Sequence, residues 1–204
     1  MIFDRAGVAA TFGVSRETLA RLDALVAHLV RWQRRINLIG PRTLPAIWHR
    51  HIADSAQLFT LAPTAAATWC DLGAGAGFPG LVIAAMAADA RPGLHVTLIE
   101  SDSRKAAFLT SAAQAMGVSV TVFARRIEAL PQVPQFDVIS ARALAPLPAL
   151  VAMARPLLRQ GGMLLFPKGA EAEAELALLH PIDREAVTRL PSQTQPAATI
   201  LSWT

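Results

Sequence analysis

Four glycines lie within the eight residues Gly73-Ala74-Gly75-Ala76-Gly77-Phe78-Pro79-Gly80. A glycine-rich loop lets the backbone approach a ligand closely, and its amide groups can bind the acidic groups of a nucleotide-like cofactor. Two registers fit this loop. From Gly75 the letters match G-x-G-x-x-G, the dinucleotide fingerprint, whereas from Gly73 they match G-x-G-x-G, which is typical of loops that bind S-adenosylmethionine (SAM). The loop therefore predicts a nucleoside cofactor and leaves its identity open.

A carboxylate with a suitable position follows the loop. Glu100 ends a β-prone run at residues 95–100 and stands twenty residues after Gly80. An acid at a strand end accepts hydrogen bonds from both hydroxyls of an adenosine ribose. This feature serves NAD and SAM equally well, so Glu100 supports a cofactor site without choosing between the two cofactors.

The elements that must position these residues alternate along the chain. Short β-prone runs occupy residues 68–72, 95–100, 118–123, 136–140 and 163–166, and helix-like segments lie at 80–90, 104–116, 146–158 and 170–179. This alternation predicts an α/β fold with βαβ units and a mostly parallel sheet covered on both faces. A last strand is expected at 198–203, and residues 191–197 are expected to form a surface loop.

The segment before the first strand differs in pattern and charge. Apolar residues recur with helical spacing over residues 17–32, and a second helical stretch is expected at 44–59. Residues 1–50 carry eight arginines and three acids, whereas the rest of the chain is close to neutral. Arg31, Arg34 and Arg35 cluster at the end of the first helix. A segregated basic segment indicates a polyanionic partner or, equally, an arginine-rich solvated surface.

The bulk properties narrow the class of protein. The chain has 204 residues, 53% of them hydrophobic, which suits one globular domain with a modest extension. No apolar run reaches the roughly 18 residues that cross a bilayer, and no secretion signal is evident, so we expect a cytoplasmic protein without a membrane contact. Cys70 is the single cysteine, which excludes an internal disulfide and predicts a buried thiol.

Loop register and chain length help to choose between the two cofactors. In the SAM register Gly73 directly follows the predicted first strand, whereas the dinucleotide register begins two residues later. About 140 residues remain after the N-terminal helices are set aside, enough for one nucleotide-binding unit, and nothing after Gly162 resembles a second nucleotide half. These observations favour SAM, and an NAD(P)-dependent oxidoreductase and a non-catalytic nucleotide-binding module remain as alternatives.

An ordered set of short motifs carries a more specific signal. His51-Ile52-Ala53-Asp54-Ser55 precedes the glycine loop, and Leu-Ile-Glu-Ser (98–101), Arg-Ile-Glu (126–128), Ile-Ser-Ala-Arg-Ala (139–143) and Phe-Pro-Lys-Gly (166–169) follow it. Together these motifs resemble the RsmG/GidB family of bacterial 16S ribosomal RNA guanine-N7 methyltransferases, from about residue 31 to residue 169.

The resemblance implies a fold and an activity. The fold is a Rossmann-like, class I SAM-dependent methyltransferase with a mostly parallel seven-stranded sheet and an N-terminal helical extension. Residues 1–60 would form the basic helical cap and 61–204 the methyltransferase domain. The implied reaction transfers a methyl group from SAM to N7 of one guanine, of the guanine-527 type, in the 16S rRNA or the small ribosomal subunit. A monomer is expected.

The resemblance also implies residue roles. Gly73 and Phe78 would line the methionine and ribose side of the cofactor. Gly75, in the glycine cluster, and Glu100, at the strand end, are further cofactor candidates that the sequence pattern itself indicates. Ile127 and Glu128 would flank the adenine, and Arg142 would reach the cofactor or the incoming base.

The candidate residues must also suit the type of methyl transfer. Ser-Ala-Arg-Ala (140–143) replaces the Asp/Asn-Pro-Pro-aromatic loop that holds amino nitrogens, and Cys70 lies within a strand, away from any nucleophile position. Guanine N7 has a free lone pair and needs alignment more than a base. His51 and Asp54 share a helix face and are candidates for the base pocket, or a packing pair.

Two further expectations concern RNA and metals. Lys168, Arg31, Arg34 and Arg35 are candidates for RNA phosphate contacts. The spacing of His49, His51 and Cys70 does not suit a metal, so none is expected.

Overall fold

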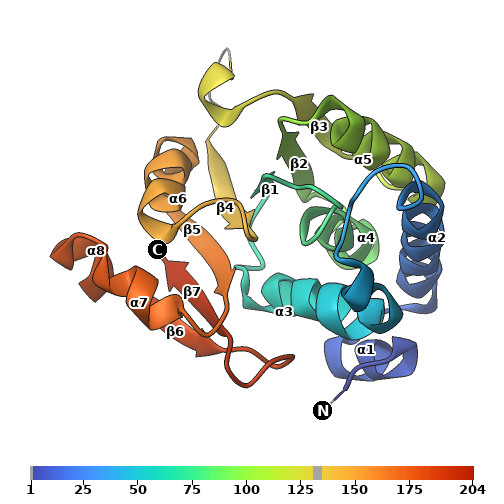
Figure 1. The fold of residues 1–204 in the computed structure, drawn as a ribbon, viewed down its shortest axis with the longest axis horizontal. Helices are drawn as coiled ribbons and strands as arrows, with labels where there is room; N and C mark the ends of the chain where they lie inside the picture. Colours follow the sequence, from blue (N-terminus) through green and yellow to red (C-terminus); the bar gives the residue numbers. More distant parts are fainter. Residues whose placement is uncertain (1, 131–134) are drawn as a thin grey trace.

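The computed structural model describes residues 2–130 and 135–204 (Figure 1). Its centre is a seven-stranded sheet in the order β3-β2-β1-β4-β5-β7-β6. The strands are β1 (Thr68–Leu72), β2 (His95–Glu100), β3 (Thr121–Ala124), β4 (Phe136–Ala141), β5 (Leu158–Lys168), β6 (Thr188–Pro191) and β7 (Thr199–Trp203). The first five pair in parallel, and β7 runs antiparallel to both β5 and β6. This confirms the mostly parallel seven-stranded sheet that the family resemblance implies.

Helices cover both faces of the sheet. The helices of the parallel units are α4 (Gly80–Ala90), α5 (Ser103–Met116) and α6 (Leu147–Ala154), and α6 continues as the 3-10 turn η4 (Arg155–Leu157). Two short helices, α7 (Ala172–Ala177) and α8 (Pro181–Glu185), precede β6. The strand order reverses between β1 and β4, and at this switch point the loops after the two strands diverge and leave room for a ligand.

Each face of the sheet has its own apolar core, as the period-two pattern of buried strands requires. Trp69 and Leu98 point toward α4 and α5, whereas Cys70, Leu72 and Ile139 point toward α6. Cys70 is fully buried, as expected from its apolar surroundings.

The N-terminal helices thicken one face rather than standing apart. They are α1 (Arg5–Phe12), α2 (Arg16–Trp32) and α3 (Asp54–Leu61), and in Figure 1 they gather beside α4 and α5. Leu22, Leu25 and Leu29 of α2 are fully buried in the same core as α4 and α5. The predicted division into a cap at 1–60 and a domain at 61–204 stays a prediction, and the shared core makes the two parts one packing unit.

The helical stretch expected at 44–59 is not one α-helix. The chain forms a 3-10 helix η1 (Pro41–Ala46), then a π-helix η2 (Trp48–Ala53), and only then α3. Pro45 lacks an amide hydrogen and prevents a regular helical ladder there. The π-helical turn widens the helix where His51 sits, and such turns are frequent at functional sites.

Smaller differences concern element ends. α1, α8 and β6 were not expected, β5 begins five residues earlier than predicted, and β3 begins three residues later than predicted. No helix among the described residues is long and apolar enough to cross a membrane.

Candidate active site

The glycine loop adopts the register that begins at Gly73. Gly73, Gly75 and Gly77 have φ of +63°, +54° and +83°, a region that residues with a side chain avoid, whereas Gly80 has an ordinary φ and begins α4. A β-carbon at Gly73 would stand 2.6 Å from a methyl carbon of Leu144. Glycine at position 73 therefore lets the loop after β1 and the loop after β4 touch.

Glu100 fastens the same loop to the end of β2. One carboxylate oxygen accepts the amide of Gly75 at 2.9 Å, and the other accepts the amide of Asp102 at 2.8 Å. The amide of Ala74 donates to the carbonyl of Ile99 at 3.0 Å. Glu100 is buried, and its two oxygens keep further lone pairs for a ligand.

A cavity of about 240 Å³ opens beside this loop. Its wall includes Gly73, Ile127 and Glu128, three of the residues expected to hold the cofactor, with Ile127 and Glu128 on the 3-10 turn η3 (Ile127–Ala129). The other lining residues are Ile99, Ser101, Arg125, Arg126, Leu144, Ala145 and Met153. This space lies at the ends of β1, β2 and β4. We call it the nucleoside cavity, after the ligand that the sequence predicts for this loop.

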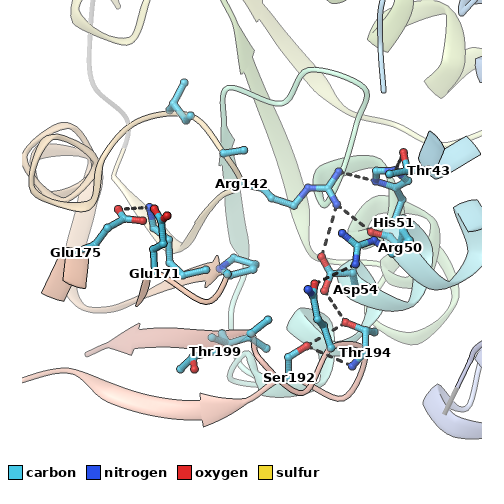
Figure 2. Close-up of a pocket in the computed structure, with 18 of the residues that line it drawn as sticks. Thr43, Arg50, His51, Asp54, Arg142, Glu171, Glu175, Ser192, Thr194 and Thr199 are labelled. Atoms are coloured by element: carbon cyan, nitrogen blue, oxygen red, sulfur yellow. Dashed lines mark hydrogen bonds and ion pairs between the residues drawn. The ribbon is translucent and has the colours of Figure 1, made fainter. Parts of the chain in front are cut away.

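A second cavity of about 720 Å³ lies beyond the loop after β4 (Figure 2). His51 and Asp54 come from the helices before β1, Arg142 from the loop after β4, and Lys168 from the end of β5. Ser192, Thr194 and Gln195 come from the β6–β7 loop. We call it the large cavity. Leu144 and Ala145 line both cavities, so the two spaces adjoin at these residues.

Arg142 is the centre of the polar wall of the large cavity. Its guanidinium donates to Nδ1 of His51 at 2.9 Å and to the carbonyl of Arg50 at 3.3 Å, and it lies 3.6 Å from the Asp54 carboxylate. Figure 2 shows these three contacts converging on one side of the cavity. Burial lowers the pKa of Arg142, and Asp54 opposes that shift. The half-buried arginine thus has partners inside the chain, and a ligand contact stays a prediction.

His51 is held as a neutral imidazole of defined tautomer. A guanidinium has no acceptor, so Nδ1 is the bare nitrogen, and Nε2 carries the proton that it donates to Thr43 Oγ at 2.8 Å. Burial, with the charges of Arg142 and Arg50, lowers the pKa of His51 to about 3. The ring also stacks on Phe78 with centroids 4.9 Å apart.

Phe78 connects the glycine loop to this polar wall. It is buried, with His51 on its ring and the Arg142 guanidinium 5.5 Å from its centroid. Phe78, Gly75 and Glu100 do not line the nucleoside cavity as it stands, whereas Gly73 does. Of the residues expected to bind the cofactor, some therefore line the nucleoside cavity, and others contact the glycine loop without lining that cavity.

Asp54 faces both the arginine and the β6–β7 loop. It accepts hydrogen bonds from Thr194 at 2.8 Å and from Gln57 at 3.0 Å. The sequence predicted only an exposed loop at residues 191–197, and this loop instead forms part of the large cavity. Its run of hydroxyl and amide side chains, from Ser192 to Gln195, was the available signal.

Lys168 lies in an internal ion pair at the edge of the large cavity. Its ammonium donates to the Glu175 carboxylate at 2.8 Å and to the carbonyl of Ala145 at 3.3 Å, and its side chain is 10% exposed. The same Glu175 oxygen accepts the amide of Leu147, the first residue of α6, at 2.7 Å. Lys168 and Glu175 thus hold the backbone on both sides of Pro146, at the end of a loop in which Ala143 has a φ of +51°.

Asp71 is a buried acid that the sequence did not single out. It lies in the apolar strand β1 and accepts the Gly80 amide at 2.9 Å and the Ser140 hydroxyl at 2.8 Å. Burial raises the pKa of Asp71 to about 7. Because the Trp69 indole donates to Ser140, this network joins β1, β4 and the start of α4 beneath the glycine loop.

Arg31, Arg34 and Arg35 lie elsewhere, at the end of α2. They are exposed and surround Trp32 and a separate cavity of about 390 Å³. None of the three lines the nucleoside or the large cavity. Within the described ranges, no three His, Cys, Asp or Glu side chains come close enough together to hold a metal.

Comparison with known proteins assigns the family. The family model described as "GidB: rRNA small subunit methyltransferase G" matches residues 18–188. The chain belongs to this family. A Methylobacterium nodulans protein named ribosomal RNA small subunit methyltransferase G is 48% identical over 97% of this chain and 93% of its own length. A protein of the same name from Jannaschia sp. is 54% identical over 81% of this chain and 78% of its own.

Solved structures agree on the fold. An O-methyltransferase from Bacillus cereus in complex with SAH superposes with a TM-score of 0.61, at 13% identity over 98% of this chain and 96% of that one. The SAH-bound methyltransferase PaMTH1 from Podospora anserina gives a TM-score of 0.55, at 15% identity over 89% of this chain and 88% of that one. The fold is that of a class I SAM-dependent methyltransferase.

Proposed function

We propose that this protein transfers a methyl group from SAM to N7 of a guanine in 16S rRNA. The observation that carries the proposal is membership of the rRNA small subunit methyltransferase G family over residues 18–188. The geometry supports it, because two cavities of different size adjoin at Leu144. The target would be a guanine of the 527 type, carried by the small subunit, and the protein would act as a monomer in the bacterial cytoplasm.

The nucleoside cavity suits the methyl donor. The positive φ of Gly73 leaves a side-chain-free floor, Ile127 offers an apolar wall for adenine, and Glu128 offers an edge-directed acceptor. Glu100, beside the loop, would accept ribose hydroxyls with its remaining lone pairs. When bound, SAM supplies an electrophilic methyl group on a positively charged sulfur.

The large cavity suits the guanine. N7 has a lone pair in the neutral base, so the chain must align the base and need not remove a proton. His51 is neutral and its ring stacks on Phe78, which fixes the cavity wall beside the arginine. Asp54 lies 3.6 Å from Arg142, and its negative charge lessens the repulsion between that arginine and a base that becomes cationic on methylation. Arg142 would orient the base or the donor while Asp54 balances its charge.

The decisive experiment combines labelled SAM with small subunits that lack the modification, followed by mapping of the methylated base. We expect one labelled guanine in 16S rRNA, and loss of 7-methylguanosine from the rRNA of a deletion strain. A thermal shift with NAD but none with SAM would instead support the oxidoreductase alternative. SAM binding without methyl transfer to any subunit or rRNA would support the nucleotide-binding module.

A further inference from the structure

A third cavity, remote in sequence from the glycine loop, lies at the C-terminal end of α2. It measures about 390 Å³ and is lined by Arg31, Trp32, Arg34 and Arg35. All four residues belong to the end of α2 and the turn that follows it. We call this space the arginine–tryptophan pocket.

The turn that carries the pocket is held by one side chain. The Gln33 side-chain oxygen accepts the amides of Leu38 and Ile39, each at 3.0 Å, and its nitrogen donates to the carbonyl of Ile39 at 2.7 Å. The amide of Arg35 also bonds back to the carbonyl of Trp32 at 2.8 Å. The pocket is therefore built on a fixed backbone, so binding a ligand there does not carry the entropic cost of ordering that turn.

The positive charge of the pocket is not paired with an acid within the described part of the chain. Among residues 2–130 and 135–204, no carboxylate lies within ion-pairing distance of the three arginines. Within the part of the chain that the structure describes, the hydrogen-bond partner of Arg31 is the uncharged Nδ1 of His28, at 3.2 Å. By contrast, Arg5 and Arg21 of the same N-terminal region pair with Asp23 and Asp89. Three arginines that line one pocket without an acidic partner can bind an external anion.

Trp32 adds a flat apolar surface to this charge. Its indole packs edge-on against the Phe108 ring, with ring centroids 5.8 Å apart, and its centroid lies 5.9 Å from that of the His28 ring. These two contacts fix the orientation of the indole. The ring is only partly buried and lines the pocket. Aromatic rings and guanidinium planes stack on unpaired bases, while arginines bind the phosphates on either side. A duplex buries its base faces and offers only its phosphates.

We propose that the arginine–tryptophan pocket is a second RNA subsite, which takes an unstacked nucleotide of single-stranded rRNA outside the methyl-transfer cavities. Trp32 would stack on the base, and Arg34 and Arg35 would bind its phosphates. This inference rests on the proposed function, because it assumes an RNA substrate. It adds that the enzyme needs a single-stranded segment away from the target guanine.

The test uses the full chain and the pentamer of uridylate as probe. We expect the pentamer to quench Trp32 emission and the Trp32→Phe variant to lose this quenching. The double variant Arg34→Glu/Arg35→Glu should bind the pentamer at least about tenfold more weakly. Its slope of log affinity against log salt concentration should be smaller in magnitude by ~2. The matched control is Arg16→Glu, at the other end of α2, where the arginine side chain is 92% exposed. It should leave the affinity close to that of the wild type.

Several results would overturn the inference. One is that inorganic phosphate or a duplex of the same length quenches Trp32 emission as strongly as the pentamer does. Another is that the double variant binds the pentamer with wild-type affinity. A third is that the Arg16→Glu control loses as much affinity as the double variant. In the methylation assay we expect a higher KM for small subunits in the double variant, with SAM affinity unchanged. If the wild type itself methylates no rRNA, the proposed function fails; if it does and the double variant keeps its KM, only the subsite fails.

Discussion

Asp71 is an ionisable side chain whose surroundings favour its neutral form. Its pKa is raised to about 7 in the fold, against about 3.9 in an unfolded chain. Between these values the unfolded state loses its proton while the folded state keeps it, so folding stability falls as pH rises from about 4 to about 7. An Asp71→Asn variant lacks this titration.

We therefore expect the wild type to lose stability relative to Asp71→Asn as pH rises through that window. The measurement is the urea midpoint of both proteins from pH 4 to pH 8. Parallel curves would mean that Asp71 is charged at all these values. They would also mean that its bonds to Gly80 and Ser140 outweigh burial.

His51 gives a dependence of the opposite sign. Its pKa falls to about 3 in the fold, because burial and two neighbouring arginines disfavour the imidazolium. The unfolded chain takes up this proton near pH 6.5, so stability falls as pH drops below that value. His51→Phe keeps an aromatic ring against Phe78 and removes the titration. We expect a flatter profile of urea midpoint for His51→Phe between pH 4 and pH 6.5; an unchanged slope would contradict a neutral His51.

At the scale of elements, the loop after β4 depends on a tether from β5 and α7. Lys168 and Glu175 contact Ala145 and Leu147 on either side of Pro146. We expect Lys168→Met to lower methyl transfer between about tenfold and about a hundredfold, because a shift of ~1 Å in Arg142 or Leu144 costs rates of this order. The assay is single-turnover methylation of small subunits at saturating SAM.

The matched control for this tether is the exposed pair between Arg189 and Glu173, which joins β6 to α7. Arg189→Gln should change the rate little, because an exposed pair contributes little. Equal losses in Lys168→Met and Arg189→Gln would point to a general loosening of α7. They would remove the specific role that we assign to Lys168.

Another tether fastens the start of α2 to the end of α4. Asp89 accepts hydrogen bonds from Ser15 and Thr18 and pairs with Arg21 at 2.8 Å. The hydroxyl bonds from Ser15 and Thr18 are the main reason that the pKa of Asp89 falls to about 2. A lowered pKa means that this contribution is present above about pH 4 and is lost as pH falls through about 2.

We expect Asp89→Asn to melt at a lower temperature than the wild type at pH 7, and the difference to shrink on acidification toward pH 2. Differential scanning calorimetry at several pH values checks this. A constant difference would show that the carboxylate charge is not what holds α2 to α4.

At the scale of the whole molecule, the N-terminal helices and the sheet share one core. The buried leucines of α2 pack in the same cluster as Leu81 of α4 and Phe108 of α5. Removing residues 1–60 would expose this apolar face. We expect one unfolding transition in the full chain, seen equally by the emission of Trp32 in α2 and of Trp69 in β1, using single-tryptophan variants. Two separated midpoints would show an independently folding cap.

Much of the architecture was predictable because it follows from local pattern. The alternation of apolar runs and helical stripes predicts the parallel units, and the glycine at the end of β1 predicts the sharp turn there. Pro45 marks a break in the expected helix at 44–59, but no local pattern over residues 48–53 marks the π-helical turn that follows it. β6 is short and mostly exposed, so its pattern carries little signal.

The candidate site divides in the same way. The ordered motifs predicted that Gly73, Ile127 and Glu128 share one site, and the three residues do line one cavity. Spacing alone did not show that Arg142 would find Asp54 and His51, because that contact joins residues about ninety positions apart. Lys168 has an internal acid partner that only the tertiary structure reveals. The role of Asp71 was not predictable, because a single acid within an apolar strand does not change the hydrophobic pattern of that strand.

Leu144 stands at the border of the two cavities, against the bare backbone of Gly73. We therefore expect the two ligands to be linked thermodynamically, because a ligand that displaces Leu144 from one cavity changes the volume of the other. Linkage is reciprocal, so rRNA should alter retention of the demethylated donor by the same factor as that donor alters rRNA affinity. Calorimetric titration of each ligand in the presence of the other would measure this factor.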